Sequence, residues 1–254
     1  MISIIIPTVN EERSLPTLLS RLREEGGDAL QYEIIVVDGG STDATVRLAR
    51  EQGARVLTSP PGRGIQLRHG AGAAAGAILL FLHADSLFPR GGLRRIEETL
   101  AGAPHLVGGN FRLLFDGATP FSRWLIGFYA WIRRIGLYYG DSGIFVRRAA
   151  YHAIGGIRPI ALMEDFDFVR RMERFGKTCC IVDPPLITSS RRFVGRRPPA
   201  IVFGWLKLHA LFYLGVSPDR LAAIYAAQAP PEARRPEAHG PGEDRQPPAR
   251  SCGR

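Results

Sequence analysis

Residues 33–43 read Glu-Ile-Ile-Val-Val-Asp-Gly-Gly-Ser-Thr-Asp, a β-branched run that changes abruptly into acidic, glycine and hydroxyl residues. β-Branched residues favour strands, whereas glycine, serine and aspartate favour turns and the first residues of helices. We therefore predict a buried strand that ends at Asp38. The chain opens in the same way, because the strand-like residues 2–6 are followed by Pro-Thr-Val-Asn at residues 7–10.

Outward from these two strand ends, short apolar runs alternate with helix-like stretches. This βαβα pattern predicts an α/β fold, with a Rossmann-like, mostly parallel central sheet covered by helices on both faces. The expected strands of the first half are residues 2–6, 33–38, 55–58 and 78–83, and the expected helices are residues 11–24, 42–52, 64–76 and 91–100. In the second half we expect strands at 106–114, 142–146 and 179–183 and helices at 120–135, 164–175 and 201–214.

The chain has 254 residues, of which 45% are apolar, so it can bury one substantial core. The regular alternation covers residues 1–105, and the less regular second half covers residues 106–228. Residues 229–254 hold six prolines and three glycines without an apolar period, and we expect them to be disordered. The sequence thus predicts a single domain in two halves, followed by a tail.

The formal net charge is +9, and arginine supplies nearly all of the positive charge. Guanidinium groups bind phosphate well, but a GC-rich genome also produces arginine by default, so composition does not indicate nucleic acid. The three cysteines cannot form a disulfide framework, which suggests a reducing, cytosolic location. We expect no secretory signal, and no run of about eighteen uncharged apolar residues predicts a membrane span.

Polar residues after the strands are the candidate ligand contacts, because ligands of such sheets bind beyond the carboxyl ends of the strands. Helix capping could explain Asn10, Ser41 and Thr42, but it does not explain Asp38 at the strand end. Residues 7–10 lack the glycine-rich turn of a nicotinamide-binding fold, which argues against that function.

The expected strand at 78–83 runs into His83-Ala84-Asp85. In an extended run, His83 and Asp85 would point the same way and could share a ligand or metal. Carboxylates suit the hard cations that carry diphosphates, whereas imidazole suits softer metals. A hydrogen bond at the strand end is the simpler interpretation of this pair, and both interpretations stay open.

Four motifs in this order resemble the family 2 inverting glycosyltransferases, which have the GT-A nucleotide-sugar fold. They are residues 3–12, Ser-Ile-Ile-Ile-Pro-Thr-Val-Asn-Glu-Glu; 36–43, Val-Val-Asp-Gly-Gly-Ser-Thr-Asp; 81–85, Phe-Leu-His-Ala-Asp; and 163–167, Met-Glu-Asp-Phe-Asp. His83 stands where the family has the first aspartate of its metal motif. Together with Gly-Arg-x-x-Gln at 62–66 and the segment 140–148, it resembles a small bacterial branch of radical-SAM/selenodomain-associated, arsenosugar-type transferases.

The resemblance implies a nucleotide-sugar-binding half at 1–105 and an acceptor-binding, catalytic half at 106–228. It implies a nucleoside diphosphate sugar as donor and a divalent metal, Mn²⁺ or Mg²⁺, as cofactor. The implied nucleotide-binding residues are Pro7, Thr8, Glu11, Asp38, Arg63 and Gln66, and the implied metal residues are Asp85 and His83.

The same resemblance implies that Asp165 is the general base, beside Glu164. A carboxylate suits that role if a partly desolvated cleft raises its pKa toward neutrality. An ordinary acidic first turn of a helix would also explain the pair. Arg191 and Arg192, with Asp141, are the candidates for contacts with the diphosphate or the acceptor, although Arg191 and Arg192 also fit a solvated basic loop.

Aromatic residues of the expected helix at 120–135 lie where the family binds its acceptor. Core packing would explain most of them, but with the basic residues nearby they also suit peripheral contact with an anionic membrane. The acceptor is therefore a small molecule or a lipid-linked hydroxyl compound. Two other functions remain: a sugar-phosphate nucleotidyltransferase, and a non-catalytic nucleotide-sugar-binding module.

Overall fold

The computed structural model describes residues 1–25, 30–117, 119–190, 193 and 197–228. Its strands are β1 (Ile2–Thr8), β2 (Tyr32–Asp38), β3 (Arg55–Thr58), β4 (Ile78–Phe81), β5 (Ser86–Leu87), β6 (Leu106–Phe115), β7 (Ile144–Arg147) and β8 (Lys177–Thr188). Within the described residues they form one eight-stranded sheet in the order β3-β2-β1-β4-β7-β6-β8-β5.

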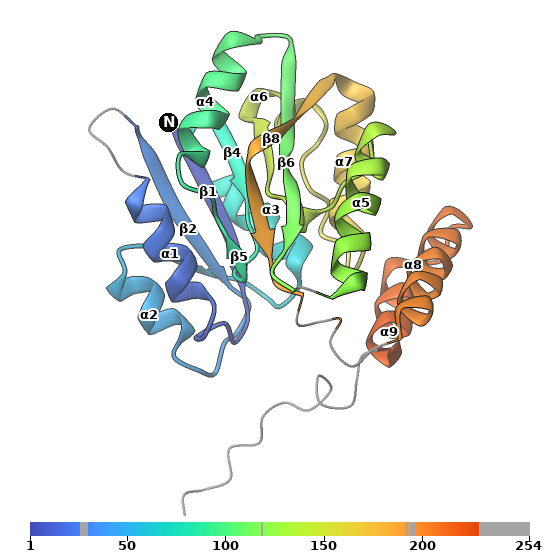
Figure 1. Cartoon of the computed structure of the whole chain (residues 1–254). Helices are drawn as coiled ribbons and strands as arrows, with labels where there is room; N and C mark the ends of the chain where they lie inside the picture. Colours follow the sequence, from blue (N-terminus) through green and yellow to red (C-terminus); the bar gives the residue numbers. More distant parts are fainter. Residues whose placement is uncertain (26–29, 118, 191–192, 194–196, 229–254) are drawn as a thin grey trace, which may run out of the picture.

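The helices lie around this sheet (Figure 1). They are α1 (Leu15–Glu24), α2 (Thr45–Glu51), α3 (Arg63–Ala73), α4 (Gly92–Gly102), α5 (Pro120–Arg134), α6 (Arg148–Ala153), α7 (Glu164–Phe175), α8 (Pro198–Tyr213) and α9 (Pro218–Gln228), with a short 3₁₀ turn, η1 (Gly140–Ser142). Apart from the short strand β5, the order of strands and helices in the first half is the predicted one.

Most neighbouring strands are parallel. β1 pairs in parallel with β2 and β4, β2 with β3, and β6 with β8, whereas β7 is antiparallel to both of its neighbours and β5 is antiparallel to β8. This arrangement confirms the predicted α/β class. The carboxyl ends of β1 and β2 lie side by side, because Thr8 is in register with Asp38.

Both faces of the sheet are buried, as the strand pattern requires. Side chains alternate along β1, so Ile4 and Ile6 pack on the face that carries α1, α2, α4 and α5, while Ile5 packs on the face that carries α3, α6 and α7. On α1 the leucines at three- and four-residue spacing are all buried. This packing fixes the strand ends from which the candidate site is built.

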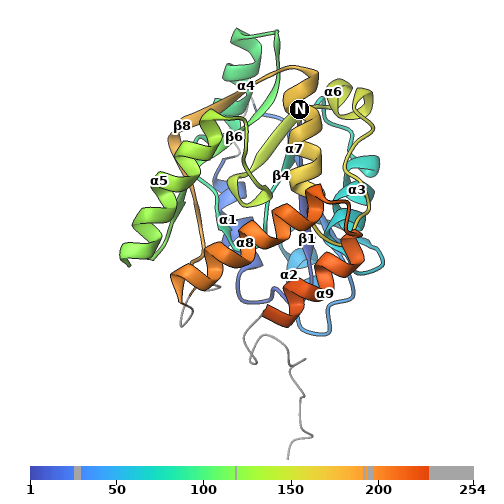
Figure 2. The ribbon, with the colours of Figure 1, turned by 90° about the vertical axis from the view of Figure 1, so that its right-hand side faces the viewer.

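The helices α8 and α9 form a hairpin at one side of the sheet (Figures 1 and 2), and Ile201 of α8 belongs to the core cluster on the face that carries α1. The hairpin's own apolar cluster joins Leu208 and Leu221 to Phe166 near the start of α7. Among the described residues, none of the helices is long and apolar enough to cross a membrane.

Several boundaries differ from the predicted ones. β4 ends at Phe81 rather than at residue 83, because the chain turns there before β5. β8 continues past Asp183 to Thr188, with a register shift against β6 that accommodates the two prolines. The elements β5, η1, α6 and α9 were not predicted. The expected disordered tail lies outside the described residues, and the division of the chain at residue 105 stays a prediction.

Candidate active site

The two loops after β1 and β2 are tied together by hydrogen bonds. The side-chain oxygen of Asn10 accepts from the backbone N–H of Thr42 at 2.9 Å, and the backbone N–H of Asn10 donates to the Ser41 hydroxyl at 2.9 Å. One step along, the Glu12 N–H donates to Asp43 at 3.1 Å, and the Ala44 N–H donates to Glu12 at 3.0 Å.

This reciprocal pairing corrects the capping interpretation of the loops. Asn10, Ser41 and Thr42 join one loop to the other, and α1 and α2 begin later, after Ser14 and Ala44, without a side-chain cap. The φ angle of Asn10 is 54°, a left-handed conformation that asparagine tolerates better than most residues. The edge of the sheet formed by the ends of β1 and β2 is therefore a single cross-linked unit.

Asp38 lies 3% exposed at the base of this unit. Its Oδ2 accepts from the N–H groups of Gly40 and Ser41, each at 3.0 Å, and its Oδ1 accepts from the Thr8 and Ser41 hydroxyls. The structure thus supplies a local reason for an aspartate at this strand end, because the Asp38 carboxylate stabilises the turn that follows it. A nucleoside contact would be a second role for the same carboxylate.

Gln66, a predicted nucleotide contact, is buried beneath the loops. Its side-chain amide donates to the carbonyl oxygens of Thr8 and Val37, at 2.9 and 2.8 Å. Both amide hydrogens are used in this way, so Gln66 joins the ends of β1 and β2 and has no N–H left for a ligand. Pro7 pairs with Val37 in the sheet, and the Glu11 N–H donates to Thr45.

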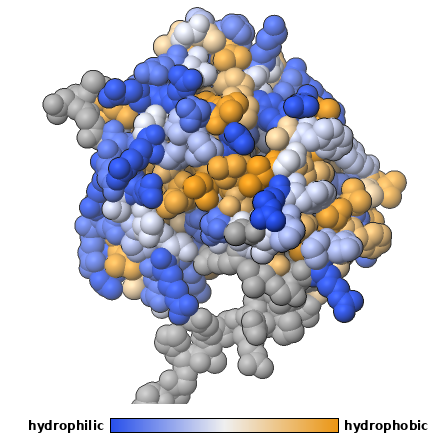
Figure 3. Space-filling view, in the orientation of Figure 1, coloured by the Kyte–Doolittle hydropathy of each residue, from blue (hydrophilic) through white to orange (hydrophobic). Residues whose placement is uncertain are grey.

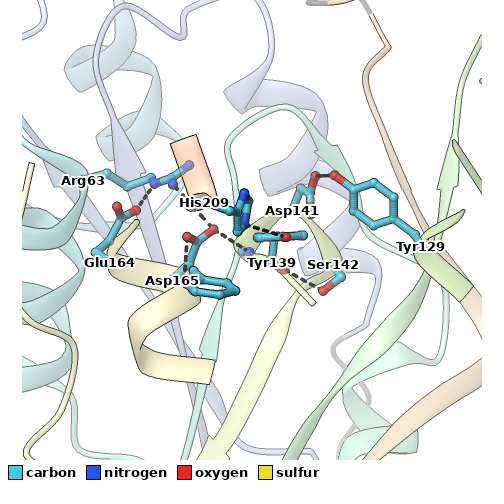
Figure 4. A network of polar contacts seen from close by, with 10 residues as sticks. Arg63, Tyr129, Tyr139, Asp141, Ser142, Glu164, Asp165 and His209 are labelled. Atoms are coloured by element: carbon cyan, nitrogen blue, oxygen red, sulfur yellow. Dashed lines mark hydrogen bonds and ion pairs between the residues drawn. The ribbon is translucent and has the colours of Figure 1, made fainter. Parts of the chain in front are cut away.

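Arg63, at the start of α3, faces two acidic residues from the start of α7 (Figure 4). It forms a hydrogen-bonded ion pair with Glu164, and its guanidinium lies 3.5 Å from the Asp165 carboxylate. The structure thus brings the predicted nucleotide residue Arg63 to the predicted catalytic pair, which sequence reasoning did not anticipate.

Backbone amides hold Asp165 in place. The Gly140 N–H donates to its Oδ2 at 2.9 Å, and the Phe166 N–H donates to its Oδ1 at 2.7 Å. The residue just before α7, Met163, has a φ angle of 68°, so the chain enters the helix through a left-handed conformation. Both acids are buried, with Glu164 1% and Asp165 8% exposed.

The two carboxyl groups have opposite pKa shifts. Burial alone would raise the pKa of Asp165, but the Arg63 guanidinium and the two N–H donors outweigh burial and lower it. Burial dominates for Glu164 and, despite Arg63, raises its pKa. The expectation that a desolvated cleft raises the pKa of Asp165 is therefore wrong, because this carboxylate is paired and hydrogen-bonded in its ionised form.

The backbone at Gly140 passes close to two of the predicted site side chains. A Cβ added there would lie 2.9 Å from His83 Nε2 and 3.3 Å from Asp165 Oδ2. His83 therefore approaches the same backbone position as Asp165.

The structure does not have the extended geometry from which we predicted that His83 and Asp85 point the same way. The strand ends at Phe81 and residues 84–85 form a turn. Asp85 lines a cavity of about 230 Å³, together with Ser14, Thr17, Ser86, Leu87, Asp116, Ile187, Thr188 and Ser189. The structure thus separates the two residues. His83 lies near Asp165, whereas Asp85 lies in the wall of this cavity.

A tyrosine–histidine pair that was not predicted borders the site (Figure 4). The oxygen of Tyr139 lies 3.0 Å from Nε2 of His209, and Nδ1 of His209 lies 2.8 Å from the carbonyl oxygen of Trp205. Because a carbonyl only accepts, Nδ1 carries a hydrogen and the Nε2 of a neutral ring accepts from Tyr139. Burial, and then the carboxylates of Asp165 and Asp141, raise the pKa of Tyr139, so it stays a neutral donor.

Asp141 lies on the same edge, 3% exposed, where its carboxylate accepts from the Tyr129 hydroxyl of α5 at 3.2 Å. The aromatic residues next to Gly140 were the signal that could have suggested Tyr139, whereas nothing in the sequence around His209 singles it out. Arg191 and Arg192 lie outside the described residues. The site thus joins the start of α3, the start of α7, η1 and α8.

Comparison with known proteins identifies relatives of this chain. The chain is 33% identical to an uncharacterized glycosyltransferase of Mycobacterium tuberculosis over 112 residues, which are 44% of this chain and 49% of that protein. The match thus spans about half the length of that relative. A PGL/p-HBAD biosynthesis glycosyltransferase of Mycobacterium bovis is 31% identical over 207 residues, 74% of this chain and 72% of that protein.

Among solved structures, the chain is similar to the mannosyltransferase PcManGT from Pyrobaculum calidifontis in complex with GDP-Man and Mn²⁺. The TM-score is 0.61 at 19% identity, over 89% of this chain and 73% of that chain. This likeness supports the GT-A fold. Residues 3–152 match the family description Glycosyl transferase family 2, a stretch that contains both cross-linked loops, Arg63 and His83-Ala84-Asp85. The chain belongs to glycosyl transferase family 2.

Proposed function

We propose that this chain is an inverting glycosyltransferase that moves a sugar from a nucleoside diphosphate sugar to a hydroxyl group of a small-molecule or lipid-linked acceptor. The observation that carries the proposal is the Asp165 carboxylate, which two backbone N–H groups hold in a fixed position next to η1. A carboxylate that is buried, oriented and ionised is suited to accept a proton from an acceptor hydroxyl.

In the proposed reaction, Asp165 accepts the hydroxyl proton as the acceptor oxygen attacks the anomeric carbon. The new carbon–oxygen bond forms on the face opposite the diphosphate, and the bond to the diphosphate breaks with its electron pair leaving on the diphosphate oxygen. Attack on the opposite face inverts the anomeric configuration. The lowered pKa of Asp165 keeps the carboxylate ionised near neutral pH, which is the form that the step requires.

The nucleoside is proposed to lie on the cross-linked loops, against Pro7, Thr8, Glu11 and Asp38. Preformed loops support this placement, because a ligand that binds to a fixed surface does not have to order it. Arg63 is the cation beside the catalytic pair, and its guanidinium is proposed to bind the leaving diphosphate as well.

Asp85 is the proposed residue for Mn²⁺ or Mg²⁺. Among the described residues no group of three or more histidine, cysteine or acidic side chains is arranged to hold a metal. The single carboxylate fits a magnesium-type site, in which substrate phosphates and water supply the other oxygen ligands. When bound, the cation would neutralise charge on the leaving diphosphate.

The test of the general base is Asp165→Asn, measured by calorimetric binding of nucleoside diphosphates and by detection of transfer or donor hydrolysis products. We expect the rate to fall by about 10²–10⁴-fold while nucleotide affinity is retained, because the base acts on the acceptor. Asp183→Asn, an exposed acid on β8, is the matched control. Near wild-type transfer would remove Asp165 from the mechanism, and lost nucleotide binding would assign it to the donor site.

The same measurements separate the alternatives. A non-catalytic module would bind nucleotide sugars without hydrolysing them, and a sugar-phosphate nucleotidyltransferase would consume a nucleoside triphosphate. The small arsenosugar-type branch and a cytosolic location stay predictions.

A further inference from the structure

The helices α5 and α8 each present an apolar face to the solvent. On α5 the residues Trp124 and Trp131 are 46% and 56% exposed, and Ile135 just beyond its end is 60% exposed. Large side chains on and just after α8 are even more exposed: Phe203 69%, Leu206 64%, Tyr213 60% and Leu214 79%. The spacing of three, four and seven residues places each set along one side of its helix.

Core packing accounts for Phe121 and Tyr129 of α5, which lie against the main core cluster, but not for the exposed Trp124 and Trp131. Trp124 stacks between Phe121 and Phe128 with ring centroids 5.7 and 5.1 Å apart, and Phe128 lies 6.2 Å from Trp131. These four rings form a continuous row of contacts along the helix, in which Trp124 and Trp131 are exposed to solvent.

The faces of α5 and α8 lie on the same side of the molecule. Phe193 contacts Phe121 of α5 and Trp205 of α8, each with ring centroids 5.8 Å apart. Figures 1 and 2 both place the two helices on the side that Figure 2 turns toward the viewer, and in Figure 3 apolar side chains reach the right-hand rim on that side. We call the exposed residues of these two helices, with Ile135 and Leu214, the α5–α8 surface.

Charge on this surface has one sign. Neither helix contains an aspartate or glutamate, and the exposed Arg123, Arg134 and Lys207 lie among the apolar residues. Asp219, in the first turn of α9, is an acidic residue at the end of the hairpin.

We propose that the α5–α8 surface docks the protein on an anionic lipid bilayer. Tryptophan, tyrosine and phenylalanine are the residues that enter the interfacial region of a bilayer, and arginine and lysine beside them bind anionic headgroups. A second copy of the chain is a poorer partner, because it would bring two sets of cations together without acids to pair with them.

The surface adjoins the candidate active site. Tyr129 of α5 donates to Asp141, and His209 of α8 contacts Tyr139, so the helices that would rest on the bilayer also border the site. Resting on the proposed transferase function, this placement makes the acceptor a lipid-linked hydroxyl compound presented from the bilayer.

The experiment is co-sedimentation of the full chain with vesicles of phosphatidylcholine alone or mixed with phosphatidylglycerol. We expect binding to the anionic vesicles that weakens with added salt, because the headgroup attraction is screened. The variant Arg123→Gln/Arg134→Gln/Lys207→Gln should bind about 100-fold more weakly, at about fivefold for each cation. Phe203→Ser/Leu206→Ser should bind at least about tenfold more weakly.

Control variants remove three cations, or one exposed apolar side chain, elsewhere on the molecule. Arg50→Gln/Arg94→Gln/Arg95→Gln removes exposed arginines of α2 and α4, and Val182→Ser removes an exposed apolar residue of β8. Both should bind vesicles as the wild type does. Equal binding to both kinds of vesicle, an absence of binding, or equal losses in the controls would overturn the proposal.

Light scattering and calorimetry separate this proposal from its rivals. A dimer that dissociates in Phe203→Ser/Leu206→Ser, without vesicle binding, would assign the surface to a second copy. Nucleotide-sugar binding by calorimetry is an independent measurement. If nucleotide-sugar binding is retained while vesicle binding is absent, the bilayer proposal fails and the transferase proposal stands. If vesicles are bound but nucleotide sugars are not, the transferase proposal fails and the bilayer proposal stands.

Discussion

Replacing Arg63 with methionine should reveal how strongly the two proposed catalytic acids, Glu164 and Asp165, depend on one guanidinium for their stability in the fold. Glu164 and Asp165 are 1% and 8% exposed, and Arg63 is a cation that pairs with both of them. Methionine keeps much of the length and apolar volume of the arginine stem but removes the charge. The variant therefore leaves two buried carboxylates beside each other without their partner.

The expected loss of stability follows from the burial of the three groups. Removing one partner of a buried ion pair costs about 3–5 kcal/mol. The Arg63 side chain is 37% exposed, so solvent already screens part of the interaction. We therefore expect a loss of about 2–3 kcal/mol, which corresponds to a melting temperature lower by about 4–12 °C for a chain of this size.

The loss should depend on pH in a definite direction. In the wild type, the lowered pKa of Asp165 contributes stability above the pKa of the unfolded carboxyl, and this contribution is lost as the pH falls. Without Arg63, the pKa of Glu164 rises further and the pKa of Asp165 is lowered less than in the wild type. The stability of the variant relative to the wild type therefore falls as the pH rises and both carboxyl groups ionise.

The assay is thermal unfolding followed by circular dichroism at about pH 5 and about pH 8, where the second condition should show the larger difference from wild type. Arg68→Met, on the exposed side of α3, is the matched control and should change little at either pH. A wild-type melting temperature for Arg63→Met at the higher pH, or an equal loss at both, would refute the reasoning.

Two further predictions concern the donor site. Asp38→Ala should weaken the binding of nucleoside diphosphates, measured by calorimetry, by about 1.5–3 kcal/mol, the scale of a hydrogen bond to a charged group. Its control is Ser41→Ala, which removes one loop contact but keeps the carboxylate. Unchanged affinity in folded Asp38→Ala would contradict the nucleoside role. Asp85→Asn should abolish the dependence of nucleotide binding on Mn²⁺, whereas His83→Asp should retain or strengthen it by adding an oxygen ligand. Normal Mn²⁺-dependent binding by Asp85→Asn would show that the metal site lies elsewhere.

The regular parts of the fold could be predicted because local pattern and tertiary environment agree. The helix at 164–175 has its predicted bounds, since an acidic first turn leads into buried residues at helical spacing, and the strand at 55–58 is also as predicted. The predicted strand at 179–183 is shorter than β8, which continues through two prolines to Thr188, and the register shift that tolerates these prolines depends on the partner strand β6. Such pairing is not visible in one segment of sequence.

The site was predictable in its residue types more than in its contacts. The sequence marked Glu164, Asp165 and Arg63 separately, but their ion pairs join residues about 100 positions apart. The extended geometry assumed for His83 and Asp85 failed because a turn begins after β4. Tyr139 and His209 meet only because α8 folds back over η1, and nothing local in either segment indicates that contact.

The reciprocal hydrogen bonds between the loops after β1 and β2 also bear on how donor preference could be changed. Asn10 and Glu12 each donate one hydrogen bond to the loop after β2 and accept one from it. Grafting one loop from a relative would break contacts in both, because each loop supplies the partners of the other's backbone. The two loops are therefore one exchangeable module, and substitutions in residues 9–12 and 39–45 should be inherited, or engineered, together.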